Sequence, residues 1–151
     1  VILGFKDLFI PYVTEGSKTH TVRGGNRWRV GMRADLFEKV RQKGMRLIFR
    51  APVVKVQEIE IREARNADED LTVEVRIDGC ALDPAEIEAF FRRDGFRKPD
   101  DVPAVNLAHG FWMGRLPFRG QIIHWDYSER FFNVVETSER VARATGWKHL
   151  G

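Results

Sequence analysis

The chain has 151 residues, of which 43% are hydrophobic and 31% charged, a composition typical of a globular domain with a core of its own. It has no run of about 18 apolar residues and no signal-peptide layout at its start, so we expect a cytoplasmic protein without a membrane span. A single cysteine excludes an internal disulfide and a cysteine-rich zinc site, and the four histidines lack metal-binding spacing, so no metal or cofactor is predicted.

The basic residues are concentrated in one segment. Between Lys18 and Lys55 there are eleven Lys or Arg residues against only Asp35 and Glu38, a net charge of +9. The rest of the chain carries 14 basic and 20 acidic residues, so the overall charge of +3 hides this asymmetry. Such a segment points to a polyanionic partner, nucleic acid first, although charges on exposed strands can also serve solubility alone.

The first predicted element is a helix over 7–15, which Gly16 ends and Pro11 shortens. It is followed by the stretch richest in chemistry, 16–23, which combines an amine, hydroxyls, an imidazole and a guanidinium in a short element that leads from a loop into a strand. Residues three apart on a regular strand point to opposite faces, so Lys18 and Thr21 can converge only if the chain bends near Gly16.

Several later segments alternate apolar and polar residues, as half-buried antiparallel strands do. They are 33–40, a long strand from Leu47 to Val56 with a bulge at Pro52, 73–77 and 123–127. Helices are predicted over 83–94, which starts with Asp83-Pro84, and over 102–112. We therefore expect one domain over 1–127 and a C-terminal extension over 128–151, either a helix with a narrow apolar face or a tail that orders on contact.

The order of these elements, the pattern Gly-x-Lys-Thr-x-Thr-x-Arg at 16–23, the Asp94-Gly95-Phe96 helix end and the closing strand at Ile122–Trp125 resemble the ASCH domain of the PUA-like superfamily. The resemblance covers 1–127, and 16–23 is its most specific part. It implies an α+β, mostly β fold: a small antiparallel β-barrel flanked by helices, with a cleft floored by 16–23. Members of the family are thought to bind RNA, and some resemble hydrolases.

The nearest chemical precedent in that family is a bacterial amidohydrolase of N4-acetylcytidine, in which the lysine of the motif is the base, its second threonine the nucleophile and a later glutamate the proton donor. The resemblance assigns these roles to Lys18, Thr21 and Asp94, although aspartate is one methylene shorter than glutamate. A lysine base needs a lowered pKa, and a carboxylic proton donor needs a raised one. Other members resemble ribonucleases.

A purely binding role requires less precise placement of side chains than catalysis does. Lys18, Arg23, Arg27 and Arg29 supply positive charge for phosphates, and Trp28, between two arginines, either stacks on a base or lies in the core. Three classes of function remain open: a module that binds RNA or a modified nucleoside, a hydrolase of a nucleoside amide or of RNA, and a protein-interaction adaptor. For the remaining aromatic residues, we expect Phe111, Trp112 and Trp125 to lie in the core, with the rim of the cleft as the alternative for Phe111 and Trp112.

Overall fold

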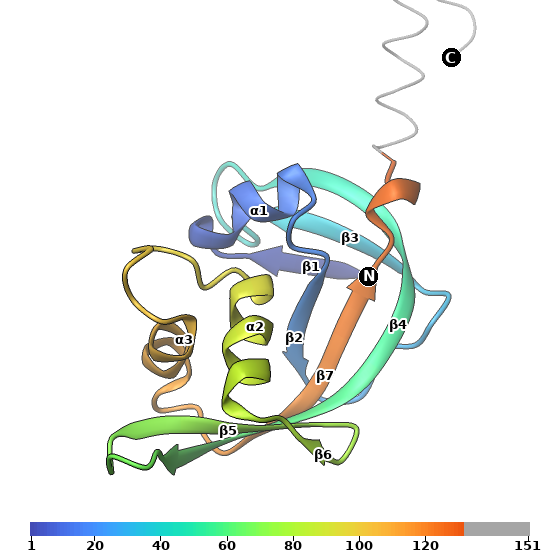
Figure 1. The fold of residues 1–151 in the computed structure, drawn as a ribbon. Helices are drawn as coiled ribbons and strands as arrows, with labels where there is room; N and C mark the ends of the chain where they lie inside the picture. Colours follow the sequence, from blue (N-terminus) through green and yellow to red (C-terminus); the bar gives the residue numbers. More distant parts are fainter. Residues whose placement is uncertain (132–151) are drawn as a thin grey trace, which may run out of the picture.

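The structure is a computed structural model that describes residues 1–131. It is an α+β fold in which strands predominate, and a single sheet carries helices on one side (Figure 1). The strands are β1 (Ile2–Phe5), β2 (His20–Gly24), β3 (Arg33–Glu38), β4 (Arg46–Arg65), β5 (Leu71–Ile77), β6 (Cys80–Ala81) and β7 (Phe118–Trp125). The helices are α1 (Ile10–Glu15), α2 (Pro84–Asp94) and α3 (Ala104–Trp112), with short 3-10 helices η1 (Asp7–Phe9) and η2 (Tyr127–Glu129). Most of the extension predicted over 128–151 lies outside the described residues.

Strand β4 organises the sheet because it is long enough, at 20 residues, to pair with three others. Its first half pairs with β3, and its second half pairs with β5 on one side and β7 on the other. The predicted bulge is confirmed: the register with β7 shifts between Val53 and Lys55, and β4 is drawn as a long curve in Figure 1.

Two aspects of the predicted barrel differ in the structure. The β1–β3 pair is parallel, whereas the other pairs are antiparallel. Within residues 1–131 the pairing runs β1-β3-β4-β5-β6, with β2 joined to β4 through β7, and no pairing links β1 to β2. The sheet is therefore strongly curved but open, and closure into a barrel is not confirmed.

The predicted helices are found close to their expected bounds. Helix α2 begins with a capping box in which Asp83 accepts a hydrogen bond from the Glu86 backbone, and it ends at Gly95 in the left-handed conformation, φ 114°. The helix predicted over 7–15 divides into η1 and α1, with Pro11 in the first turn of α1, where its missing N–H is tolerated. The last strand ends two residues before the predicted Tyr127, which starts η2 after an Asp126 cap.

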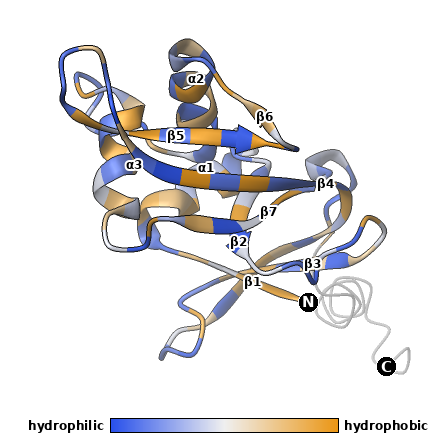
Figure 2. Cartoon of the chain, turned by 90° about the horizontal axis from the view of Figure 1, so that it is seen from below, coloured by the Kyte–Doolittle hydropathy of each residue, from blue (hydrophilic) through white to orange (hydrophobic). Residues whose placement is uncertain are grey.

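The core lies between the curved sheet and helices α2 and α3. Hydrophobic and hydrophilic residues alternate along β4 and β5 (Figure 2). Phe91 and Ala108 are fully buried against the sheet, and Trp125 is buried as predicted. No helix within residues 1–131 is long and apolar enough to cross a membrane.

Candidate functional site

The bend that precedes β2 is built by Gly16. This residue caps α1 with φ +87°, and a Cβ there would lie 2.5 Å from the Tyr127 ring, so both conformation and space favour glycine. The Lys18 N–H then donates to the Tyr12 carbonyl at 2.9 Å, which fixes the turn. Lys18 thus lies outside the strand, and its side chain lines the same cleft as Thr21, as the predicted bend requires.

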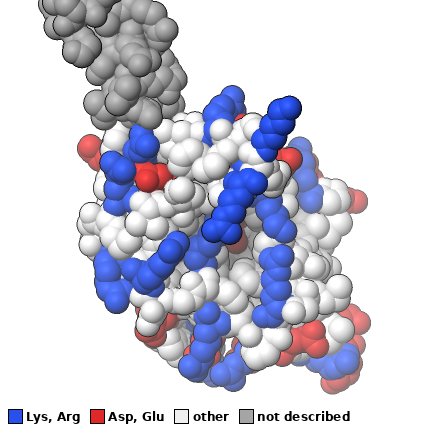
Figure 3. Space-filling view, turned by 180° about the vertical axis from the view of Figure 1, so that it is seen from behind, with Lys and Arg blue, Asp and Glu red and all other residues white. Residues whose placement is uncertain are grey.

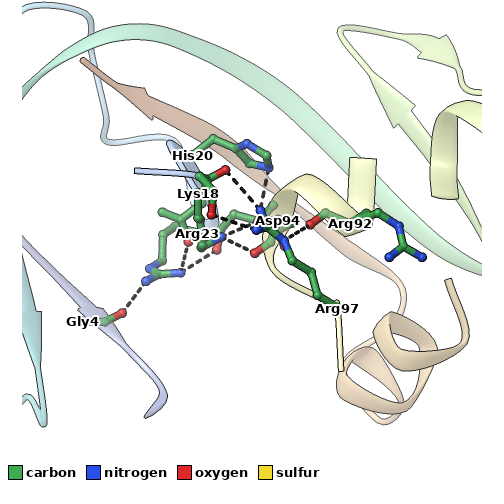
Figure 4. A network of polar contacts seen from close by, with 10 residues as sticks. Gly4, Lys18, His20, Arg23, Arg92, Asp94 and Arg97 are labelled. Carbon is green, nitrogen blue, oxygen red and sulfur yellow. Dashed lines mark hydrogen bonds and ion pairs between the residues drawn. The ribbon is translucent and has the colours of Figure 1, made fainter. Parts of the chain in front are cut away.

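Lys18 forms a buried ion pair with the end of α2. Its Nζ donates to Asp94 Oδ1 at 2.7 Å and to the Asp94 carbonyl at 2.6 Å, and the two residues are 1% and 5% exposed (Figure 4). The His20 Nε2 lies 3.3 Å from the same carboxylate oxygen. The resemblance assigned Lys18 and Asp94 to one site, and the fold brings them into contact across 76 positions of the chain.

Both groups of this pair have lowered pKa values, for different physical reasons. Burial lowers the pKa of Lys18, and attraction to Asp94 offsets part of this effect. Burial alone would raise the pKa of Asp94, but the charge of Lys18, the nearby His20 imidazole and the hydrogen bond from Lys18 outweigh it and hold that pKa at about 2. Asp94 therefore lacks the raised pKa that a proton donor requires, because Lys18 and His20 stabilise its carboxylate.

Thr21 is tied to Arg23. The Arg23 Nη1 donates to Thr21 Oγ1 at 2.7 Å and to the Val22 carbonyl at 2.9 Å, while Nη2 donates to the Gly4 carbonyl on β1. Among residues 1–131, no hydrogen bond joins Lys18 Nζ to Thr21 Oγ1, the contact that a base and its nucleophile need. The floor is thus held by two separate polar pairs.

These side chains line a cleft of about 490 Å³. The aromatic rings of Phe5, Phe9, Phe111 and Phe118 add apolar walls, and the exposed Lys6 and Arg115 also line it. Lys6 Nζ lies 4.9 Å and the Arg115 guanidinium 4.6 Å from the centre of the Phe111 ring. With Lys18 and Arg23, four cations face one carboxylate.

Lys and Arg side chains also surround a hollow on one face of the molecule, where Asp and Glu side chains lie mainly toward the margins (Figure 3). The cleft therefore combines positive charge with aromatic surface, a pairing that suits nucleotides.

The other residues predicted to bind nucleic acid, Arg27, Trp28 and Arg29, do not line the cleft. Trp28 is 1% exposed, and the Gln121 side chain satisfies its backbone: Trp28 N–H donates to Oε1 at 3.0 Å, and Nε2 donates to the Trp28 carbonyl at 3.2 Å. Stacking of Trp28 on a base is therefore wrong, and its core alternative is confirmed. Arg27 and Arg29 are exposed between β2 and β3, and neither lines the cleft.

Sequence reasoning missed Lys6, Phe9, Arg115 and Phe118 as parts of the site. They lie before η1, in η1, in the loop after α3 and at the start of β7, so no local motif marks them and only the fold places them together. Phe111 and Trp112, expected in the core or at the rim of the cleft, both line the cleft. Trp112 is also part of the buried core, with 6% of its surface exposed.

No group of three or more His, Cys, Asp or Glu side chains suited to a metal ion occurs in the described part of the chain. The fold and cleft define an α+β domain with a basic, aromatic-walled pocket. Comparisons with models of known protein families, with characterised proteins and with solved structures found no match.

Proposed function

We propose that this chain is an ASCH-type, PUA-like domain that binds single-stranded RNA or a modified nucleoside in the cleft along β2. The observation that carries the proposal is the composition of the cleft: four cationic side chains and four phenylalanine rings line a space of about 490 Å³. Aromatic faces stack on unpaired bases, and Lys and Arg neutralise phosphates. The resemblance supports it because its signature element, 16–23, supplies Lys18, Thr21 and Arg23 to this cleft.

The parts of the cleft suit different parts of a nucleotide. Lys6 and Arg115 are exposed, so they fit a phosphate that stays in contact with water. Phe111 and Phe118 offer rings to a base, and the floor offers hydroxyl and guanidinium groups to its edge. The proposal includes a PUA-like fold in which the sheet is curved but open. It also includes a cytoplasmic location, with which the exposed thiol of Cys80 is compatible.

Exposed cations inside and outside the cleft provide the test. The Lys6→Ala/Arg115→Ala variant and the Arg27→Ala/Arg29→Ala variant each remove two exposed positive charges, so their net charges match. Binding of a labelled single-stranded RNA would be measured by filter retention or anisotropy at fixed salt. We expect the cleft variant to lose about tenfold in affinity and the loop variant less than about threefold.

Equal losses in the two variants would overturn the cleft as the binding site. If wild type retains no RNA and no modified nucleoside, the proposal is wrong as a whole, and an acidic protein partner becomes the next hypothesis to test. Thermal unfolding of both variants checks that the fold is unchanged.

Hydrolysis is the second candidate, favoured by one observation: burial lowers the pKa of Lys18, and Lys18 and Thr21 line the same cleft. The test reaction is the conversion of N4-acetylcytidine and water to cytidine and acetate, followed by chromatography. Catalysis by Thr21 predicts that Thr21→Val abolishes turnover and that Thr21→Ser, which keeps a hydroxyl, retains part of it. Turnover that survives in Thr21→Val and in Lys18→Ala would exclude both residues as catalytic groups.

A further inference from the structure

A second hollow lies beside the cleft and shares a wall with it. It measures about 460 Å³, and its lining includes Tyr12, Phe96, Arg97, Lys98, Leu107 and Phe111. Phe111 also lines the cleft along β2, so the two spaces meet at this side chain. The second hollow is lined by η1, α1, the loop after α2, and α3, of which η1 and α3 also contribute to the cleft.

The chemistry of this second hollow repeats that of the cleft. The Arg97 guanidinium lies 4.3 Å from the centre of the Tyr12 ring, so the two form a stacked platform. Arg97 is held there because its Nε donates to the Arg92 carbonyl and its Nη1 to Ser17 Oγ, both at 2.8 Å. Lys98 is exposed beside it, and Asp7 is the one acidic residue in the lining.

Two cationic side chains lie over the Phe111 ring that both spaces share. Lys6 and Arg115 both lie within 5 Å of the centre of the Phe111 ring, at 4.9 and 4.6 Å, and both line the cleft. A backbone phosphate that crosses from one space to the other would pass these cations. Two aromatic pockets joined by a cationic divider match the repeat of a nucleic acid strand, in which bases alternate with phosphates.

We propose that the second hollow is a subsite for the neighbouring nucleotide, so that the natural ligand is a single-stranded segment of at least two nucleotides. One base occupies the cleft, the next occupies the hollow against the Arg97–Tyr12 platform, and the phosphate between them passes Phe111. This inference rests on the proposed function of the cleft, which it deepens by excluding a lone nucleoside as the preferred ligand.

Ligand length tests the inference. Titration calorimetry would compare cytidine 5′-monophosphate with the 5′-phosphorylated dinucleotide of cytidine, at one salt concentration. A second stacked base predicts a gain of about tenfold in affinity for the dinucleotide. If both probes bind with the same affinity, the second subsite is wrong while the proposed function of the cleft stands; if neither binds, both are wrong.

An exposed lysine tests the location of the subsite. Lys98→Ala is expected to lower the affinity for the dinucleotide about threefold or more and to leave the mononucleotide unchanged. Lys43→Ala removes the same charge from an exposed turn remote in sequence from either pocket lining and is the matched control. Loss of mononucleotide binding in Lys98→Ala, or equal effects of the two variants on the dinucleotide, would overturn the assignment.

Discussion

Strand β2 and the loop that follows it both come from the basic segment, but the fold uses their charges in different ways. Around β2, Lys18 is 1% exposed and paired with Asp94, and Arg23 is held against Thr21. In the loop, Arg27 and Arg29 are exposed, and the Arg29 side chain donates to the nearby Asn26 and Trp28 carbonyls. Charge density in a sequence therefore does not locate a site; a buried charge with a partner beside a cleft is the better criterion.

The largest expected difference between these regions is in stability. Asp94→Ala removes the carboxylate that balances the buried Lys18 charge and leaves the amine its hydrogen bond to the backbone carbonyl of residue 94, so we expect a loss of about 3–5 kcal/mol in the free energy of unfolding. Arg27→Ala, on the exposed loop, should change it by less than about 0.5 kcal/mol. Urea unfolding of the two variants measures both values.

A double variant separates the lost pair from the lost packing. Lys18→Met with Asp94→Leu replaces both charges by apolar side chains and should recover part of the stability lost in Asp94→Ala. A loss below about 1 kcal/mol in Asp94→Ala would show that the buried amine finds water or another acceptor, and the contrast between strand and loop would then fail.

Glycine substitutions make the same comparison through the backbone. A Cβ at Gly120, opposite Gly24 of β2, would lie 2.1 Å from the Arg23 carbonyl oxygen, so Gly120→Ala must separate β2 from β7. We expect a loss of about 3 kcal/mol, since the obstacle is backbone. Gly25→Ala meets no atom within 4 Å but keeps a φ of +83°, so its expected loss is about 1 kcal/mol. Thermal or urea unfolding compares them, and equal losses would contradict the close approach at Gly120.

The same contrast explains what could be predicted from the sequence. Helix α2 was predicted closely because Asp83, Pro84 and Gly95 are local signals at its two ends. The first half of β4 and its bulge followed from alternation and Pro52, whereas the continuation of the strand from Val56 to Arg65 was not predicted. The partnership of Lys18 with Asp94 was implied by the family resemblance alone, since nothing local links residues 76 positions apart.

Other features depend on tertiary contacts that no short pattern encodes. Strand β1 has only four residues, so its sequence gives a weak signal. Its conformation is stabilised by pairing with β3. Trp28 is buried although arginines flank it, because the Gln121 side chain pairs with its backbone from β7. The sequence left stacking on a base and burial in the core both open for Trp28, and its contacts with a buried glutamine 93 positions away accompany the burial.

Acid should weaken the β2 region through one carboxylate. The pKa of Asp94 is about 2 in the folded protein against an ordinary value of 3.8, so the ionised form stabilises the fold above about pH 4. This contribution, about 2 kcal/mol, is lost as the pH falls from 4 toward 2. The difference in unfolding free energy between wild type and Asp94→Asn should therefore shrink over that range. Asp101→Asn, an exposed substitution of the same kind, is the control, and a difference that stays constant with pH would contradict the assignment.

The smallest expected effect is the most specific for the proposed binding mode. A cation that neutralises an RNA phosphate releases a counterion, and for a single strand each such contact contributes about 0.7 to the slope of log affinity against log salt. Arg115, at the cleft, should account for one contact, so Arg115→Ala is expected to reduce the slope by about 0.7, whereas Arg27→Ala should leave it unchanged. Affinity measured at four or five salt concentrations gives each slope. A reduction in both variants would mean that RNA lies across the whole basic face, and the cleft would then lose its special role in binding.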